Sequence, residues 1–173
     1  MTAADSRFAT IGTPDGPFTV IADAHDVVLA SGWTDDPDYL LALIHRTIRP
    51  PSVRPSTQLG ALTEAVSAYY AGQLSAIDAI AVRQRSGPFL EQAWQTLRTL
   101  TPGEPASYRQ FAELAGEPNA IRAAASACAR NAAALFVPCH RVVRSDGSLG
   151  GFRYGLTIKQ SLLAHESEIR ATG

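Results

Sequence analysis

Cysteine is scarce in this sequence, and long apolar runs are absent. Cys128 and Cys139 are the only cysteines among 173 residues. Without a basic start and an apolar core in residues 1–20, two thiols favour free cysteines in a reducing cytosol, so a cytoplasmic protein is expected. A disulfide between them would strain the helix expected at Cys128. No run reaches the roughly 18 apolar residues of a membrane span, so no contact with a membrane is expected.

Lysine is nearly absent, and the charges divide unevenly. Lys159 is the only lysine, and the formal net charge is −1. Residues 1–83 carry five arginines against nine acids, which gives −4; residues 84–173 carry ten basic side chains against seven acids, which gives +3. A mildly positive second half permits contact with nucleic acid but does not require it.

The first half has the pattern of a small antiparallel sheet. Asp15-Gly16 is a turn signal between the apolar runs 8–11 and 18–22, and a third short run covers 27–30. Beyond the sheet, the periodicity predicts helices over 36–48 and 59–71 and one more strand over 77–82. The prolines at 50–55 exclude regular structure there.

The second half is predicted to be mainly helical. A helix is expected over 88–100, and Ser107 followed by Gln110 has the capping-box pattern that opens a helix over 108–115. A turn at Gly116 leads to another helix over 120–130. Two short helices joined by such a turn have the form of a helix-turn-helix.

The expected architecture is therefore α/β in two domains. Residues 1–83 form a small antiparallel sheet with helices. Residues 84–173 form a mainly helical, winged-helix-like domain that contains the helix-turn-helix.

The second helix of that unit is dominated by alanine. Alanine favours helix and lets a partner approach the backbone closely. Either this helix packs inside the domain, or its surface of small side chains contacts a binding partner. Arg122, a long cation near the helix start, favours the second interpretation, although a lone arginine is often only solvated.

Cys139 is the candidate reactive residue. It follows the apolar run 132–137 and Pro138, so it is expected at the end of a buried strand-like stretch, where it could also be a simple core residue. Reactivity requires a thiolate, and therefore a base. His140 is adjacent, and Glu166 lies 27 residues further on (166 − 139) in a helical pattern, where it could orient the imidazole. A water link between Cys139 and His140 is expected rather than direct contact.

These residues carry a resemblance to a known family. The string Val-Pro-Cys-His-Arg-Val over 137–142, the glycines at 150 and 151, and Leu-Leu-Ala-His-Glu over 162–166 resemble the O6-alkylguanine-DNA alkyltransferases. The resemblance is specific across residues 88–168 and loose across 8–83.

The resemblance implies a chemistry and a mode of DNA binding. Cys139 would accept the alkyl group of a damaged guanine irreversibly, in a single turnover, with His140 and Glu166 as the proton relay. Asn131 would tie together the hinge between the recognition helix and the active-site loop. The base must be flipped out of the duplex to reach the thiol. The partner would be double-stranded DNA, bound in the minor groove, largely independent of sequence and sensitive to salt; the protein would act as a monomer without cofactors.

The resemblance also assigns residues to the DNA and to the pocket. Arg122 would replace the extruded nucleotide in the stack, and Tyr108 would crowd the 3′ phosphate. The side chains expected on DNA are Tyr108, Arg109, Ala120, Arg122, Ala123 and Ser145. Those expected to line the substrate pocket are Tyr108, Val142, Phe152, Arg153 and Tyr154.

Three features depart from the family pattern. Phe152 stands where the family commonly has a tyrosine whose hydroxyl assists the leaving guanine. Tyr154 stands where some members have glycine, so the pocket should be narrow and should disfavour benzyl relative to methyl groups. Some members carry a structural metal held by cysteines and histidines of the N-terminal domain; here that half has no cysteine and only His25 and His45, so no zinc site is expected.

Three other functions compete with this interpretation. A cysteine hydrolase built on Cys139 would turn over repeatedly and would need an oxyanion hole, for which the sequence has no obvious donor loop. A non-catalytic binder of DNA lesions would lack the acceptor cysteine. A helix-turn-helix regulator would carry polar base-reading side chains where this chain has alanines.

Overall fold

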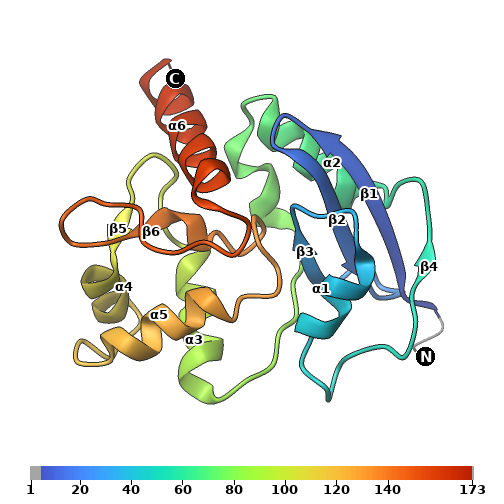
Figure 1. Ribbon diagram of the computed structural model, residues 1–173, viewed down its shortest axis with the longest axis horizontal. Helices are drawn as coiled ribbons and strands as arrows, with labels where there is room; N and C mark the ends of the chain where they lie inside the picture. Colours follow the sequence, from blue (N-terminus) through green and yellow to red (C-terminus); the bar gives the residue numbers. More distant parts are fainter. Residues whose placement is uncertain (1–4, 173) are drawn as a thin grey trace. The chain divides into compact units, whose positions relative to one another are not determined.

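The computed structural model describes residues 5–172 and divides into two compact units (Figure 1). The first unit runs up to Arg85 and also takes in Ala132–Phe136; the second consists of Ser86–Asn131 and the residues from Val137 onward. The sequence placed the boundary between residues 83 and 84 and assigned 132–136 to the second domain. The structure places residues 132–136 in the first unit instead, because of long-range contacts that hydrophobic periodicity cannot predict.

A four-stranded sheet forms the centre of the first unit. Its order is β3 (Val28–Gly32), β2 (Gly16–Ala22), β1 (Arg7–Thr13) and β4 (Arg54–Pro55), with β1, β2 and β3 antiparallel and β4 parallel to β1. Gly16 begins β2 with φ of +103°, a conformation that glycine adopts without strain. The three expected antiparallel strands and the turn are confirmed. The prediction that residues 50–55 have no regular structure is wrong at Arg54 and Pro55, because proline is tolerated on an edge strand such as β4.

Residues 132–136 lie along the free edge of β3. Ser31 N donates to Ala132 O (2.9 Å), Ala134 N donates to Ser31 O (3.2 Å), and the Ser31 hydroxyl donates to Ala134 O (2.7 Å). The ring of Phe136 packs near that of Phe18, with centroids 6.5 Å apart. This apolar segment is therefore buried by the first unit, although the residues that follow it belong to the second.

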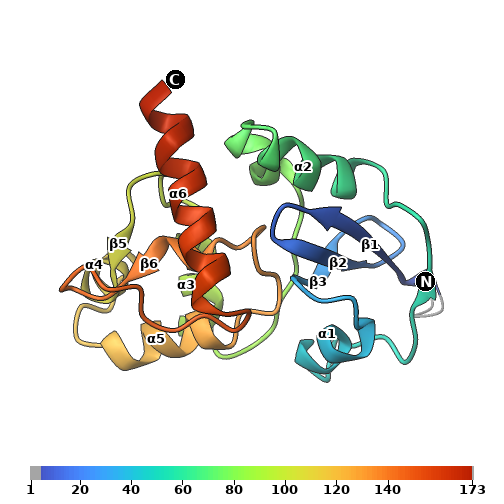
Figure 2. The same cartoon turned by 45° about the horizontal axis from the view of Figure 1, so that its top comes forward.

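Helices α1 (Pro37–Leu43) and α2 (Ala61–Tyr70) cover opposite faces of the sheet (Figure 2). Asp36 caps α1 by accepting from the amides of Asp38 and Tyr39, and the helix ends early because Ile44 is extended. The strand predicted over 77–82 is wrong. Leu74–Ala79 form a 3₁₀ helix, η2, and only Val82 makes an isolated bridge, to Val28.

The second unit packs three helices together: α3 (Pro88–Leu97), α4 (Tyr108–Leu114) and α5 (Ile121–Ala129). The Ser107 side chain accepts from Gln110 N, and the Gln110 side chain accepts from Ser107 N, so the predicted capping box is present. Trp94 Nε1 donates to Ala127 O (2.9 Å), across the α3–α5 contact. Ala124 and Ala127 on α5 are fully buried, so the small residues on this face of the helix pack inside the unit.

Two short strands and a long helix complete the second unit. β5 (Ala106–Ser107) pairs in parallel with β6 (Val142–Val143), which follows the 3₁₀ turn η3 (Cys139–Arg141). The C-terminal helix α6 spans Leu156–Thr172. Within the described part of the chain, no helix combines the length and the apolar character that crossing a membrane requires.

Candidate active site

Cys139 opens the turn η3, directly after Pro138. Its backbone amide donates to Val137 O (2.8 Å), and the residue is 8% exposed. The segment before it is buried as expected, but Cys139 lies on a turn and not at a strand end. A turn held by proline presents the sulfur in one orientation while leaving it a small opening to solvent.

His140 and Glu166 form a buried pair behind the cysteine. His140 Nε2 lies 2.7 Å from Glu166 Oε2, and both residues have no exposed surface. A carboxylate only accepts hydrogen bonds, so Nε2 carries the proton and Nδ1 keeps its lone pair. His140 Nδ1 is buried without a hydrogen-bond partner among the described residues. The imidazole is therefore oriented at one nitrogen and available as an acceptor at the other.

The electrostatics of the site keep both the thiol and the imidazole neutral at rest. Burial raises the pKa of the Cys139 thiol, while a hydrogen bond from Asn131 and the charges of Lys159 and Arg153 act against that rise. Burial lowers the pKa of His140, although Glu166 opposes the shift. The resting site thus holds a thiol beside a neutral imidazole, so the thiolate that reactivity requires must form by proton transfer to a base.

Glu166 has the opposite character. Burial would raise its pKa, but His140 and Arg141 overcome that effect and hold the pKa well below the usual range. Arg141 Nε donates to Oε1 (2.9 Å), its Nη2 donates to Oε2 (3.0 Å), and its Nη1 donates to Leu100 O (3.1 Å). The carboxylate is therefore a fixed anion that orients His140.

Two buried cations were missed by the sequence analysis. Arg141 stood inside the recognised motif but received no role. Lys159, fully buried on α6, donates to the carbonyl oxygens of Val142 (2.7 Å), Gly151 (3.2 Å) and Leu149. The signal available in the sequence was that the only lysine lies in an apolar helical pattern. Lys159 ties the chain that follows Cys139 to α6.

Asn131 lies at the end of α5, where the resemblance places the hinge. Its side-chain amide donates to Val137 O (2.7 Å), and the residue is buried. This bond closes the excursion of the chain through 132–136. Asn131 therefore links α5 to the turn that carries Cys139.

Tyr108 approaches the segment after β6 closely at Gly150. The Tyr108 hydroxyl would lie 2.8 Å from a Cβ built on Gly150, whose φ is +74°, so a larger residue could not replace this glycine without displacing the tyrosine. Burial, followed by the nearby thiols Cys128 and Cys139, raises the pKa of Tyr108 to about 12. Tyr108 remains a neutral phenol beside the site.

The other residues expected in the pocket lie in the same unit. The rings of Phe152 and Tyr154 meet edge to face, with centroids 5.9 Å apart. Arg153, between them in sequence, donates through Nη2 to Ala129 O. Val142 is fully buried in β6, where its carbonyl serves Lys159. The structure thus collects most of the expected pocket residues on one loop after the cysteine.

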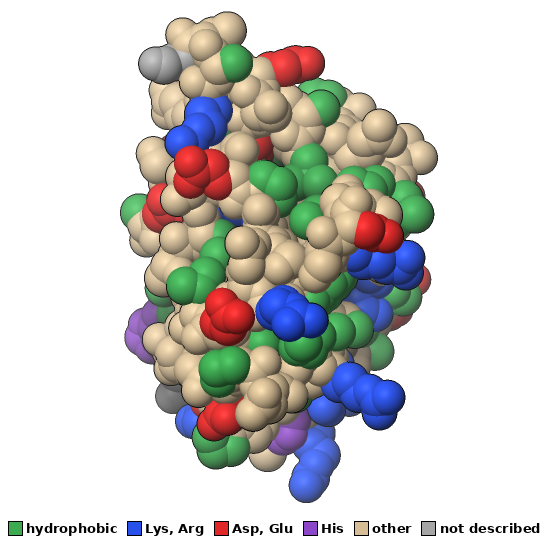
Figure 3. Space-filling model, turned by 90° about the vertical axis from the view of Figure 1, so that its left-hand side faces the viewer, with side chains coloured by type: hydrophobic (Ala, Val, Ile, Leu, Met, Phe, Trp, Pro, Cys, Tyr) green, Lys and Arg blue, Asp and Glu red, His purple; other side chains and the backbone are tan. Residues whose placement is uncertain are grey.

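The side chains expected on DNA are spread over the helix pair. Arg109 and Arg122 are exposed on the first turns of α4 and α5, and Ser145 is exposed on the turn after β6. Ala120 caps α5, and Ala123 is half-buried. Figure 3, which views the side on which α4 and α5 lie, shows acidic and basic side chains interspersed, with several basic ones near the lower edge.

A family comparison matches the second unit. A family model described as "6-O-methylguanine DNA methyltransferase, DNA binding domain" matches residues 88–168. The methylated-DNA–protein-cysteine methyltransferase of Shigella flexneri is 35% identical over 158 residues, which cover 90% of this chain and 92% of that protein. The chain belongs to this family of cysteine methyltransferases.

Further relatives agree with this membership. The methyltransferase of the same name from Mycobacterium tuberculosis is 33% identical over 163 residues, with 92% of each chain covered. The bifunctional transcriptional activator/DNA repair enzyme Ada of Escherichia coli is 52% identical over 84 residues, but this chain spans only 24% of that protein. The match to Ada therefore concerns one part of a longer protein.

Solved structures of the methyltransferase family share the fold. The crystal structure of the Mycobacterium tuberculosis enzyme in complex with DNA has a TM-score of 0.78 and 27% identity, with 94% of both chains covered. The O6-methylguanine-DNA methyltransferase of Pyrococcus kodakaraensis has a TM-score of 0.73 at 20% identity, which establishes similarity of fold alone.

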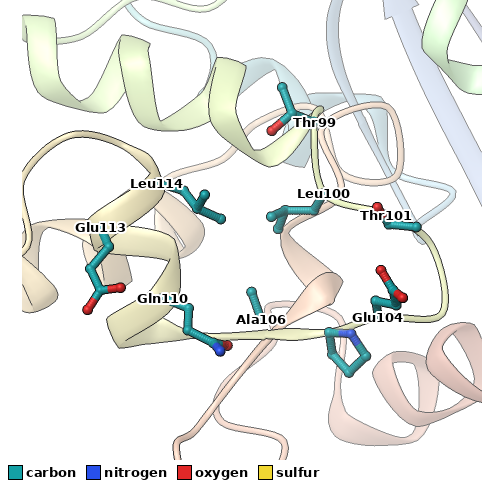
Figure 4. A pocket seen from close by; sticks show the side chains of 9 residues that line it. Thr99, Leu100, Thr101, Glu104, Ala106, Gln110, Glu113 and Leu114 are labelled. Carbon is teal, nitrogen blue, oxygen red and sulfur yellow. The ribbon is translucent and has the colours of Figure 1, made fainter.

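A separate hollow lies elsewhere on the second unit of this methyltransferase. It has a volume of about 570 Å³ and lies between the end of α3, the segment after it and α4 (Figure 4). Glu104, Glu113 and the exposed Leu114 line it, and none of the expected site residues does. Two carboxylates make it unsuited to a DNA phosphate.

No candidate metal centre accompanies the cysteine. Among residues 5–172, no three histidine, cysteine, aspartate or glutamate side chains gather in a way that could hold a metal ion.

Proposed function

We propose that this protein repairs DNA by direct reversal, moving the alkyl group of an O6-alkylguanine onto its own Cys139 once per molecule. The observation that carries the proposal is the unpartnered Nδ1 of His140, buried next to a slightly exposed cysteine and backed at Nε2 by Glu166. In this arrangement, His140 Nδ1 accepts the thiol proton as the sulfur attacks a bound substrate.

The reaction balances as a displacement at the alkyl carbon. The Cys139 thiol gives its proton to His140 Nδ1, through a water molecule, as the sulfur attacks. The S–C bond forms while the C–O6 bond breaks, and the electron pair stays on the guanine. The imidazolium then returns the proton to the guanine ring. The products are a thioether on Cys139 and unmodified guanine.

Each buried charge has a part in this step. Glu166 stabilises the imidazolium that forms transiently, and Arg141 keeps Glu166 ionised and in place. Lys159 and Arg153 stabilise the negative charge that develops on sulfur. Because a thioether has no route back to the thiol here, the protein is consumed.

The DNA contacts are part of the proposal. The guanine O6 lies inside the duplex, so the nucleotide must be flipped out to reach the buried sulfur. Arg122, exposed on the first turn of α5, is proposed to fill the gap in the stack, and the low alanine surface of this helix suits the minor groove. We propose that binding is largely independent of sequence, and that the protein acts as a monomer in the cytoplasm.

Intact-mass measurement tests the proposal. After incubation with duplex DNA containing O6-methylguanine, the chain should gain one methyl group and then stop. Cys139→Ser should gain none, and Cys128→Ser, the matched control at the only other thiol, should gain one. Repeated turnover would favour a cysteine hydrolase, and an intact lesion with folded protein would reject both functions.

A further inference from the structure

Two cationic side chains hold the loop that carries Phe152 and Tyr154 in place by hydrogen bonds to backbone carbonyls. At its base, the buried Lys159 ammonium binds the carbonyl oxygens of Leu149 and Gly151. At its tip, Arg153 Nη2 donates to Ala129 O, the carbonyl of the last residue of α5. The last carbonyls of a helix have no partner within the helix and lie at its negative end, so a guanidinium binds there favourably.

Neighbouring side chains of this loop make contacts with different partners. Phe152 and Tyr154 turn their rings toward each other, while Arg153 between them reaches α5. A displacement of the backbone that carries the Tyr154 ring would therefore strain or break the contact of Arg153 with the helix. Lys159 also donates to Val142 O, three residues after Cys139, so the same ammonium joins this loop to the strand that follows the reacting sulfur. The charge of Arg153 acts to lower the pKa of the Cys139 thiol.

We propose that Arg153 is a specificity-determining positioning residue, a latch that holds the Phe152–Tyr154 pair rigid as one wall of the alkyl pocket and so excludes bulky alkyl groups. The inference rests on the proposed alkyl transfer. It adds that the size limit comes from the attachment of the loop to α5 as well as from the volume of the Tyr154 ring.

A ratio of rates separates the latch from a general loss of activity. Single-turnover rates are measured on matched duplexes containing O6-benzylguanine or O6-methylguanine, and the benzyl-to-methyl ratio is compared among variants. Arg153→Ala should raise the ratio about three- to tenfold, the size of one typical hydrogen-bond contribution. The loss of its charge slows both substrates alike and cancels. Arg153→Lys, which can still reach a helix carbonyl, should keep the ratio near that of the unchanged chain.

A double-variant cycle tests whether Arg153 acts through Tyr154. Tyr154→Gly alone should raise the ratio, and Arg153→Ala added to it should raise it no further, because no ring remains to be held. Arg144→Ala, which removes an exposed arginine from the neighbouring turn, is the matched control and should leave the ratio unchanged.

The possible results distinguish a failure of the Arg153 proposal from a failure of the proposed alkyl transfer. An unchanged ratio in Arg153→Ala, or equal effects of that change with and without Tyr154, overturns the latch while the alkyl transfer stands. Absence of methyl transfer to Cys139 in the unchanged chain rejects the proposed function itself. Methyl transfer by Arg153→Ala shows that the variant is folded.

Discussion

Arg141 holds the carboxylate of Glu166 through two parallel hydrogen bonds, Nε to Oε1 at 2.9 Å and Nη2 to Oε2 at 3.0 Å, with both side chains buried. Since the same carboxylate also faces His140, one buried ion pair supports both the fold of the second unit and the orientation of the base. Loss of the carboxylate charge should therefore affect stability and reaction together.

Glu166→Gln should lower the free energy of unfolding by roughly 3–5 kcal/mol, because it leaves the Arg141 charge buried without its counter-ion. Alkyl transfer by the folded variant should slow by about 10²–10⁴-fold, the range of general-base catalysis. Urea unfolding and single-turnover kinetics measure the two effects. Glu104→Gln, at the exposed pair with Arg170, should lose less than about 1 kcal/mol and leave the rate unchanged. Equal losses in the two variants would contradict this account.

The rate of alkyl transfer should be nearly independent of pH from below about 6.5 to above about 8.5. The pKa of His140 is lowered and that of Cys139 is raised, so the neutral thiol and imidazole prevail over the whole interval between their ordinary values. His140→Gln removes the base, and its slower rate should instead rise about tenfold per pH unit as thiolate forms. Parallel profiles for the two proteins would exclude the imidazole as the acceptor.

The free energy of unfolding should depend on pH through the same groups. The depressed pKa of Glu166 contributes stability that is present above the ordinary glutamate value of about 4.3 and is lost as the pH falls through the folded value. The lowered pKa of His140 removes stability as the pH falls below about 6.5, because only the unfolded chain then takes up that proton. Acid titration of stability should therefore be shallower in Glu166→Gln.

Arg122→Ala should slow transfer from duplex DNA by roughly 10- to 100-fold, since an unfilled gap leaves the few kcal/mol of base extrusion uncompensated. With the same lesion in a single strand, the rate should change little. Arg130→Ala, at the other end of α5, should show at most the salt-dependent loss of one phosphate contact. A similar loss on single strands would assign Arg122 to general affinity.

Phe152→Tyr should accelerate transfer about three- to tenfold if the added hydroxyl donates to the leaving guanine. Single-turnover rates on methylated duplex measure the gain, and Phe152→Leu controls for a change of ring packing. An unchanged rate would mean that the guanine receives its proton elsewhere in this chain.

Local patterns were sufficient for the sheet and the helix pair. The capping box at Ser107 and the turn at Asp15-Gly16 depend on contacts within a few residues, and both appear as predicted. The strand over 77–82 failed because an apolar run of that length also suits a short 3₁₀ helix.

Long-range contacts account for the rest of the site. Residue types and spacing indicated Cys139, His140 and Glu166, and the resemblance agreed. No pattern indicated that Arg141 would bind the same carboxylate or that Lys159 would bind three carbonyls. The resting protonation state of Cys139 could not be predicted either, because the pKa of a cysteine depends on burial that sequence alone does not provide.

The packing of residues 132–136 along β3 also limits which fragments of this chain can be soluble on their own. Ala132 to Phe136 are each at most 4% exposed, and Ala132 and Ala134 are hydrogen-bonded to the backbone of Ser31. A fragment starting at residue 86 would keep the cysteine and the helix pair but would carry this apolar segment without its strand. Such a fragment should aggregate, and supplying the first half as a separate chain should restore its solubility.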